Sequence, residues 1–331
     1  MNGLRIGFLD QLHPAIRDAI NTNLPADWTA IHSVSRDFAD QAATITDADA
    51  VYVFATPVRT ALIEKAAKLR LVHKLGAGVD NIDLETCAAR GIAVARLSGG
   101  NAVQVAEHTI LMMLAASRRL VELDRRTRAG EWLKEDSRGR NHQLHGKKIG
   151  LIGFGAIGRQ VAKMLLPFGV DIVYYDVLGL RSDEERQLQV RRLDLDDLLA
   201  TSDIVSLHVP LMDATLNLLN AERLEKMKHG AILVNCARGG LIDEAALVDA
   251  LENGHLAAAA LDTFVKEPPS GSRLLELEQT IVTPHVAGVS IENFVDVLRA
   301  AIGNTTSYFG GQGLPAACAV VTPNIDSANG R

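Results

Sequence analysis

The chain has 331 residues, 47% of them hydrophobic and 22% charged, so we expect a globular protein with room for two domains. A formal net charge of −6 argues against nucleic acid as the main partner. No apolar run reaches a membrane span, the N-terminal residues lack a signal-peptide core, and the three distant cysteines show no metal spacing, so we expect a cytoplasmic protein without a membrane or metal partner.

The first 98 residues alternate between strand and helix patterns. In chain order they predict a strand at 4–9, a helix at 13–21, a strand at 28–31, a helix at 37–43, a strand at 50–54, a helix at 60–67, a strand at 71–75 and a helix from Leu84. Such alternation predicts a parallel sheet that is covered on both faces.

A glycine-rich turn at residues 76–83 follows the last of these strands. Ligands of open α/β sheets gather beyond the carboxyl ends of strands, and the backbone N–H groups of such a turn can hold a carboxylate. A plain tight turn is the alternative for this stretch taken alone.

Residues 101–128 form the longest helical pattern and are expected to make one helix. His108 lies within it, where a core or interface histidine is the simpler interpretation than a catalytic one. The polar run at 130–145 contains Trp132, which indicates either a partner surface or simple packing.

A dinucleotide fingerprint begins where the strand pattern ending at Ile152 stops. Gly153 allows the tight turn, Gly155 lets a pyrophosphate approach the backbone, and Gly158 lets the next helix pack closely. The N–H groups near Ala156 and Ile157, at the start of that helix, would face the phosphates.

Asp176 ends the next apolar run, at the offset expected for the acid that binds the adenosine ribose. A carboxylate there favours NAD, because the 2′-phosphate of NADP would meet a like charge. Arg181, a few residues on, could weaken that preference.

The remaining patterns continue the α/β alternation. They predict helices at 193–200, 243–253 and 290–308, strands at 203–207, 231–235, 257–261 and 281–283, and a small polar tail from Gly310. The dinucleotide unit, residues 99–289, is thus expected to be an NAD-binding domain inserted between two pieces of a substrate-binding domain, 1–98 and 290–331. The two chain crossings, near residues 99 and 289, could act as a hinge.

Polar side chains follow the later strands and suggest a reaction. Arg238 offers a fork that matches a carboxylate, His285 can give and take a proton near neutral pH, and Glu267 would orient His285 and stabilise its charged form. Asp262 would accept from the nicotinamide carboxamide. A solvated charge or a structural histidine is the ordinary interpretation of each residue alone, but the group together favours hydride transfer to a 2-oxo acid.

The sequence resembles the D-isomer-specific 2-hydroxyacid dehydrogenases in five ordered blocks, at residues 76–83, 101–107, 153–176, 234–243 and 260–288. The resemblance implies two Rossmann-like, doubly wound parallel-sheet α/β domains, the cofactor domain being inserted into a split, flavodoxin-like substrate domain. It implies catalysis by Arg238, Glu267 and His285, carboxylate binding at Ala77 and Gly78, a D-hydroxy acid product and a homodimer. The cofactor contacts that it adds are His208, Val209, Pro210, Thr215, Cys236, Ala237 and Gly288.

The substrate stays open between hydroxypyruvate or glyoxylate and 3-phosphoglycerate. Phosphoglycerate dehydrogenases commonly carry an arginine after the strand at 50–54, whereas here Arg59 is displaced toward the next helix. Formate dehydrogenases have Gln where Glu267 stands, which argues against formate. Two alternatives remain: an NADH-sensing protein of the corepressor type, and a methyltransferase or hydrolase on a similar fold.

Overall fold

A computed structural model describes residues 3–97 and 100–323. The chain divides into two compact units, one built from residues up to Asn101 and from Val289 onward, the other from Ala102–Gly288. The chain crossing expected near residue 99 lies outside the described residues. Among the residues described, no helix combines the length and apolar character that crossing a bilayer requires.

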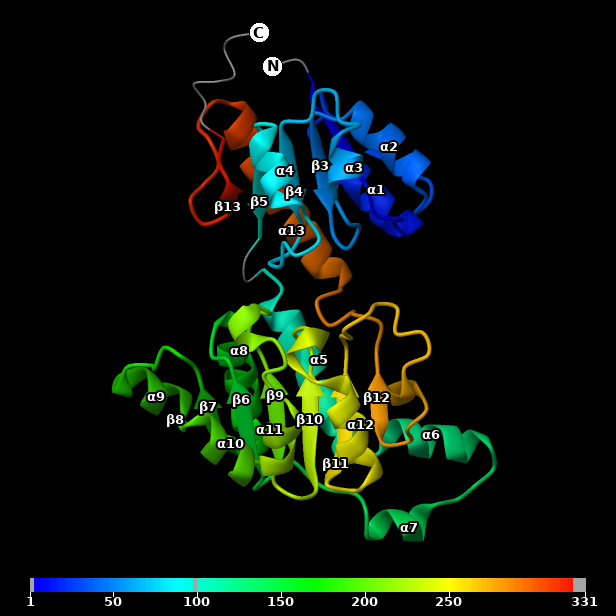
Figure 1. The fold of residues 1–331 in the computed structure, drawn as a ribbon, viewed down its shortest axis with the longest axis vertical. Coiled ribbons are helices and arrows are strands. Elements are labelled where there is room, and N and C mark those ends of the chain that lie inside the picture. The colour runs from blue at the N-terminus through cyan, green and yellow to red at the C-terminus, as the bar shows by residue number, and fades with distance from the viewer. Residues whose placement is uncertain (1–2, 98–99, 324–331) are drawn as a thin grey trace. The chain divides into compact units, whose positions relative to one another are not determined.

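The first unit is a six-stranded sheet in the order β13-β5-β4-β3-β1-β2, in which only β13 runs antiparallel to its neighbour (Figure 1). Its strands are β1 (Arg5–Phe8), β2 (Thr29–His32), β3 (Ala50–Val53), β4 (Leu71–Lys74), β5 (Ala93–Arg96) and β13 (Ala319–Val321). Its helices are α1 (Pro14–Asn23), α2 (Phe38–Thr46), α3 (Thr60–Ile63), α4 (Leu84–Ala89) and α13 (Ile291–Phe309).

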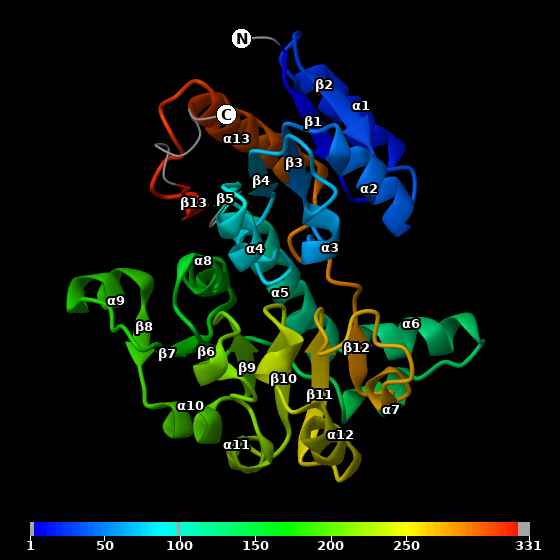
Figure 2. The ribbon, with the colours of Figure 1, turned by 45° about the horizontal axis from the view of Figure 1, so that its top comes forward.

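Helices cover both faces of this sheet. Helices α1 and α13 pack on one face, where Ile20 and Leu298 are fully buried, and α2, α3 and α4 pack on the other, where Ile45 and Cys87 are fully buried (Figure 2). Helix α13 begins at a side-chain cap, because Ser290 Oγ accepts the Asn293 N–H. The C-terminal helix therefore belongs to the core of the N-terminal sheet.

The second unit is a seven-stranded parallel sheet in the order β12-β11-β10-β9-β6-β7-β8. Its strands are β6 (Lys148–Ile152), β7 (Asp171–Tyr175), β8 (Val190–Arg192), β9 (Ile204–Leu207), β10 (Ala231–Asn235), β11 (Leu256–Leu261) and β12 (Thr280–Val282). Its α-helices are α5 (Ala102–Ser117), α6 (Leu120–Arg128), α7 (Lys134–Arg138), α8 (Ala156–Leu165), α9 (Ser182–Leu188), α10 (Leu195–Thr201), α11 (Ala221–Lys226) and α12 (Glu244–Glu252). Short 3-10 turns are η1 (Leu166–Phe168), η2 (Asp213–Thr215), η3 (Gly239–Leu241) and η4 (Arg273–Leu275).

Two apolar layers enclose this second sheet. Alternate residues of β6 point to opposite faces, so Ile149 and Leu151 pack beneath α5 and α8 while Ile152 packs beneath α10, α11 and α12. Gly150 leaves the space that Leu198 fills, since a Cβ there would lie 2.5 Å from Leu198 Cδ2. The prediction of two doubly wound α/β sheets is confirmed, with β13 as an antiparallel addition.

The single helix expected at 101–128 is wrong. Arg119 adopts a left-handed conformation, with φ of +52°, and divides the segment into α5 and α6. Its guanidinium holds the break through Glu122 (Nε to Oε2, 2.7 Å) and Asp136 (Nη1 to Oδ2, 3.3 Å), while the Ser117 carbonyl accepts the His142 N–H. The elements α7, α9, α11, β5, β8 and β13 were not predicted, and the tail contains β13.

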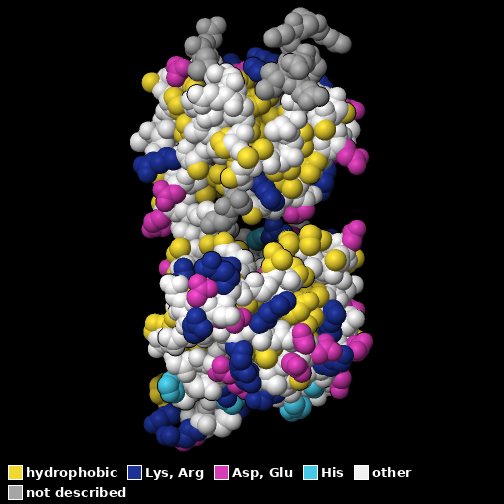
Figure 3. Space-filling model, turned by 90° about the vertical axis from the view of Figure 1, so that its left-hand side faces the viewer, with side chains coloured by type: hydrophobic (Ala, Val, Ile, Leu, Met, Phe, Trp, Pro, Cys, Tyr) yellow, Lys and Arg dark blue, Asp and Glu magenta, His cyan; other side chains and the backbone are white. Residues whose placement is uncertain are grey.

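The surface does not separate charges by sign on the face drawn in Figure 3. Lysine and arginine side chains are interspersed there with aspartate and glutamate. On helix α6, Arg128 and Asp124 form an ion pair one helical turn apart, at 2.9 Å.

Candidate functional site

The glycine loop after β6 has the three separate properties that the fingerprint requires. Gly153 has φ of +96°, and a Cβ there would lie 2.6 Å from the His208 carbonyl. A Cβ at Gly158 would lie 2.3 Å from the Gly153 carbonyl oxygen, so α8 can pack this closely only with glycine. A Cβ at Gly155 would meet nothing within 4 Å. The open side of the loop therefore lies at Gly155, directly before the first residue of α8, Ala156, and its neighbour Ile157.

Asp176 lies against this loop at the end of β7. Its Oδ2 accepts the Phe154 N–H at 2.7 Å, and its Oδ1 accepts the Leu178 N–H at 3.0 Å. Arg181 is exposed and pairs with Asp183 at 2.8 Å. The cation beside Asp176 is instead Arg192 of β8, whose Nη2 donates to the Asp176 carbonyl at 2.8 Å.

The residues after β9 are held close to the glycine loop. The His208 N–H donates to the Ile152 carbonyl at 2.6 Å, and its Nε2 lies 3.0 Å from Ser206 Oγ. Burial lowers the pKa of His208 to about 4, so this imidazole is neutral at pH 7. A Cβ at Gly153 would lie 2.8 Å from Val209 Cγ1, which places Val209 over the loop.

Thr215 shapes the turn that follows. Its hydroxyl donates to the Pro210 carbonyl at 2.7 Å and accepts the Met212 N–H at 2.8 Å. The expected cofactor residues Pro210 and Thr215 therefore contact each other, and Thr215 already uses its donor within the turn.

Asn235, at the end of β10, organises the turn that carries Arg238. Its Nδ2 donates to the Arg238 carbonyl at 2.8 Å, and its Oδ1 accepts the Ala237 N–H at 3.0 Å. Arg238 Nη1 donates to the Ala237 carbonyl at 2.7 Å. Burial raises the pKa of the Cys236 thiol to about 12, so Cys236 is a neutral thiol. Asn235 was not among the predicted site residues, although an amide side chain at the end of a strand is a signal for a turn held by side-chain hydrogen bonds.

His285 and Glu267 form a direct pair at the end of β12. His285 Nδ1 lies 2.9 Å from Glu267 Oε2, and the Phe264 N–H donates to Glu267 Oε1 at 3.1 Å. Burial acts to raise the pKa of Glu267, but the hydrogen bonds and charge of His285, the Phe264 N–H and the charge of Arg238 outweigh it, so the pKa lies below its ordinary value. Glu267 therefore stays ionised at neutral pH and fixes Nδ1 of His285 as the protonated nitrogen, leaving Nε2 for another partner.

Asp262, at the end of β11, is fully buried beneath the loop that carries His285. Its Oδ1 accepts Thr283 Oγ1 at 2.5 Å and the Val286 N–H at 2.9 Å, and its Oδ2 accepts the Ala287 N–H at 2.9 Å. Its carbonyl accepts the His285 N–H at 2.9 Å. The expected acceptor for a carboxamide is thus engaged with its own loop, with capacity left on Oδ2.

Strand order brings the catalytic candidates to one edge of the second sheet. Because β10, β11 and β12 are adjacent and parallel, Arg238, Asp262 and His285 follow three neighbouring carboxyl ends (Figure 1). Gly288 is the last residue of the unit. The glycine loop follows β6, where the strand order reverses between β6 and β9, and crevices at such reversals bind ligands.

Ala77 and Gly78 belong to the first unit, in the turn after β4. Ala77 is exposed, and its carbonyl accepts Arg96 Nη1 at 3.3 Å. Asn81 ties this turn to the loop after β3, because its Nδ2 donates to the Thr56 carbonyl at 2.9 Å.

Asp10 holds the loop after β3 from the other side. Its carboxylate accepts the N–H groups of Phe54, Ala55 and Thr56 at 2.6 to 2.9 Å. Arg59 is exposed and precedes the first residue of α3. The loop at 54–58 therefore presents neither a basic side chain nor these three N–H groups to an anion.

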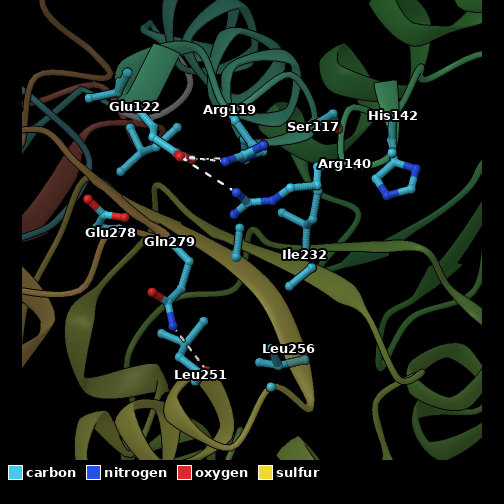
Figure 4. Close-up of a pocket in the computed structure, with 17 residues that line it drawn as sticks. Ser117, Arg119, Glu122, Arg140, His142, Ile232, Leu251, Leu256, Glu278 and Gln279 are labelled. Atoms are coloured by element: carbon cyan, nitrogen blue, oxygen red, sulfur yellow. Dashed lines mark hydrogen bonds and ion pairs between the residues drawn. The ribbon is translucent and has the colours of Figure 1, made fainter. Parts of the chain in front are cut away.

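A hollow of about 510 Å³ lies at the opposite edge of the second sheet. It is lined by residues at the amino ends of strands, including Ile232 and Leu256, together with residues around α6 and α7. Figure 4 shows Glu122 between Arg119 and Arg140, with Glu122 Oε1 3.9 Å from Arg140 Nη1. Because this hollow faces away from the glycine loop and from His285, it takes no part in the candidate site.

Comparison with known proteins decides the family. Residues 110–287 match the model of the D-isomer specific 2-hydroxyacid dehydrogenase, NAD binding domain. The chain belongs to the D-isomer-specific 2-hydroxyacid dehydrogenase family. The matched residues lie within the second unit, so that unit is the NAD-binding domain of this family, and the prediction of NAD is confirmed.

Individual members of the 2-hydroxyacid dehydrogenase family resemble the chain over most of its length. It is 38% identical to a D-3-phosphoglycerate dehydrogenase of Archaeoglobus fulgidus over 83% of this chain and 51% of that protein. It is 41% identical to a hydroxypyruvate reductase of Thermotoga maritima over 72% of this chain and 77% of that protein. A Staphylococcus aureus NAD-dependent formate dehydrogenase, solved in complex with NAD, superposes with a TM-score of 0.84 at 26% identity, and the superposition covers 97% of this chain and 99% of that chain. The chain spans about half the length of the curated phosphoglycerate dehydrogenases that it matches.

Proposed function

We propose that the protein interconverts a 2-oxo acid and a D-2-hydroxy acid with NAD as the hydride carrier. The observation that supports this most is the pair of His285 Nδ1 and Glu267 Oε2 at 2.9 Å, at the carboxyl edge of an NAD-binding sheet. A histidine held this way can donate a proton to a developing alkoxide and recover it in the reverse direction.

The residues present fit NAD. The pyrophosphate would lie over Gly155 and the first N–H groups of α8, where a Cβ meets nothing within 4 Å. Asp176 would accept the ribose hydroxyls with the oxygen capacity that its two backbone donors leave. Val209 and Pro210 would line the adenine pocket. When bound, NADH supplies a hydride for the substrate carbonyl carbon.

The chain's own groups would do the remaining chemistry. Nε2 of His285 would give a proton to the substrate oxygen, while Glu267, which lies 2.9 Å from Nδ1, would stabilise the imidazolium and keep the ring oriented. The guanidinium of Arg238 holds the carboxylate and polarises the carbonyl. The N–H groups of Ala77 and Gly78 would also bind a substrate carboxylate.

The substrate belongs to the small 2-oxo and 2-hydroxy acids, with hydroxypyruvate or glyoxylate and 3-phosphoglycerate as the candidates. The loop after β3 favours the unphosphorylated acids, because Asp10 engages the N–H groups of Phe54, Ala55 and Thr56. The loop's own residues include no lysine or arginine before Arg59, and the nearby Lys74 ammonium already donates to the Phe54 carbonyl.

We also propose a homodimer that works in the cytoplasm. Exposed apolar side chains gather on α5, α6 and the segment before α7, where Leu111, Leu120, Val121 and Trp132 are at least half exposed. Trp132 is 80% exposed, which is unusual for a tryptophan outside an interface. The compartment is supported by Cys87, Cys236 and Cys318, which are free thiols.

The direct test is NADH oxidation against a panel of glyoxylate, hydroxypyruvate, pyruvate, phenylpyruvate and 3-phosphohydroxypyruvate. Arg238→Ala should lose most activity on every acid while NADH binding persists. Arg273→Ala is the matched control, since Arg273 is an exposed arginine of the same unit that pairs with Glu252 and Glu276. Retained turnover in Arg238→Ala would remove the role assigned to that residue. Tight NADH binding without turnover of any acid would favour an NADH sensor instead.

A further inference from the structure

The loop that carries His285 is anchored on the buried side chain of Asp262. Asp262 has no exposed surface, and its carboxylate and carbonyl accept hydrogen bonds from residues on both sides of His285 as well as from His285 itself. His285 has φ of +55°, a left-handed conformation that is unfavourable for a residue with a Cβ. The bonds to Asp262 therefore hold His285 in a conformation that its own backbone does not favour.

A second histidine reaches the same carboxylate from helix α5. His108 Nε2 lies 3.2 Å from Thr283 Oγ1 and 3.7 Å from Asp262 Oδ1. The side chain of His108 is 15% exposed, so this contact is largely shielded from water.

The protons of this network can be assigned by counting donors. Both carboxylate oxygens of Asp262 accept backbone N–H groups, so we assign the single proton of the Thr283 hydroxyl to its bond with Asp262 Oδ1. Thr283 Oγ1 must then accept from His108, which requires a proton on Nε2 of His108. The chain of donors runs from His108 through Thr283 to Asp262, and every link points toward the carboxylate.

We infer that His108 and Thr283 are positioning residues, which act through Asp262 to hold the loop of His285. This inference rests on the proposed function for its catalytic consequence, because it assigns His285 as the acid–base group. Neither residue is expected to touch the substrate. Their removal should loosen the loop at residues 283–287 and misplace the imidazole, while the glycine loop around Gly155 keeps its affinity for NADH.

The test compares removal variants with conservative ones. Thr283→Val and His108→Leu remove the hydroxyl and the ring donor, whereas Thr283→Ser and His108→Gln keep a hydroxyl and a neutral N–H donor. Thr280→Val is the matched control, because the Thr280 hydroxyl of the same strand, β12, bonds to the carbonyls of Leu274 and Leu277 and not to Asp262. Each variant is assayed for kcat, KM and NADH affinity, and for amide exchange of the peptide 283–288.

The removal variants should lose about tenfold to a hundredfold in kcat, the scale of a small misplacement of a catalytic group, with KM and NADH affinity nearly unchanged. Exchange at the Val286 and Ala287 amides should become faster, and the conservative variants should restore both properties. Thr280→Val should lower stability and leave kcat and those amides unchanged.

Wild-type kcat in both removal variants would overturn the inference. A loss of kcat that parallels a loss of thermal stability, and that Thr283→Ser and His108→Gln do not restore, would overturn it as well. The exchange arm separates this inference from the proposed function. If the wild-type protein turns over no acid, the proposed function fails. In that case, unchanged exchange at residues 283–287 in Thr283→Val and His108→Leu would also reject the positioning role, whereas faster exchange would support it.

Discussion

Two glycines of the same loop should fail in different ways when each receives one methyl group. A Cβ at Gly158 would lie 2.3 Å from the Gly153 carbonyl oxygen, whereas a Cβ at Gly155 would meet nothing within 4 Å. Gly158→Ala should therefore act on stability, and Gly155→Ala should act on the cofactor alone.

The size of each effect follows from these contacts. Overpacking against backbone costs about 1–3 kcal/mol, and alanine returns up to about 1 kcal/mol in a helix interior, so Gly158→Ala should lose about 1–2 kcal/mol. For a unit of this size that corresponds to a fall in Tm of about 2–8 °C. Gly155→Ala displaces a pyrophosphate from charge-assisted hydrogen bonds worth about 1.5–3 kcal/mol, which weakens NADH binding about tenfold to a hundredfold.

Thermal unfolding without cofactor and NADH titration by fluorescence separate the two outcomes. Gly155→Ala should unfold at the wild-type temperature and bind NADH weakly. Should Gly158→Ala prove as stable as wild type, or Gly155→Ala bind NADH normally, the account of this loop would be refuted.

Three further predictions concern the carboxylates of Glu267, Asp176 and Asp10. The pKa of Glu267 is lowered in the folded protein, so the ionised side chain contributes its full stabilisation above the ordinary value of 4.5 and loses it as the pH falls through the lowered value. The difference in urea stability between wild type and Glu267→Gln should therefore become smaller in acid. With Arg192 beside the ribose acid, Asp176→Asn should raise kcat/KM for NADPH about tenfold by removing repulsion, and an unchanged NADPH rate would contradict the role of that carboxylate. Asp10→Ala frees three N–H groups in the first unit and should cost about 2 kcal/mol in the denaturant stability of that unit; NADH affinity measured beside it should not change.

Local patterns predicted most of the strands and the motifs, because a buried strand or a glycine turn is determined largely by residues that are adjacent in the sequence. Strand β13 was not predicted because it is short and pairs antiparallel with β5, which lies more than two hundred residues earlier in the chain. The break at Arg119 was not predicted because the segment has no glycine or proline there. The left-handed conformation of Arg119 is held instead by its bonds to Glu122 and Asp136.

The site was predictable where its residues belong to local motifs, and not where it depends on tertiary contacts. The motif named His285 and Glu267 as partners, and the two lie within hydrogen-bond distance. Nothing local showed that Asp262 anchors the loop of His285, or that His108, 175 residues from Thr283, contacts its hydroxyl. Contacts of that kind arise only once strands and helices are packed.

The central claim is the transfer of hydride to a 2-oxo acid with His285 as proton donor. It is tested most directly by coupling NADH oxidation to chiral analysis of the product, in wild type and in His285→Gln. We predict that wild type forms one D-hydroxy acid for each NADH oxidised, and that His285→Gln binds NADH and forms almost none. An L-hydroxy acid product, or undiminished turnover in His285→Gln, would contradict the account.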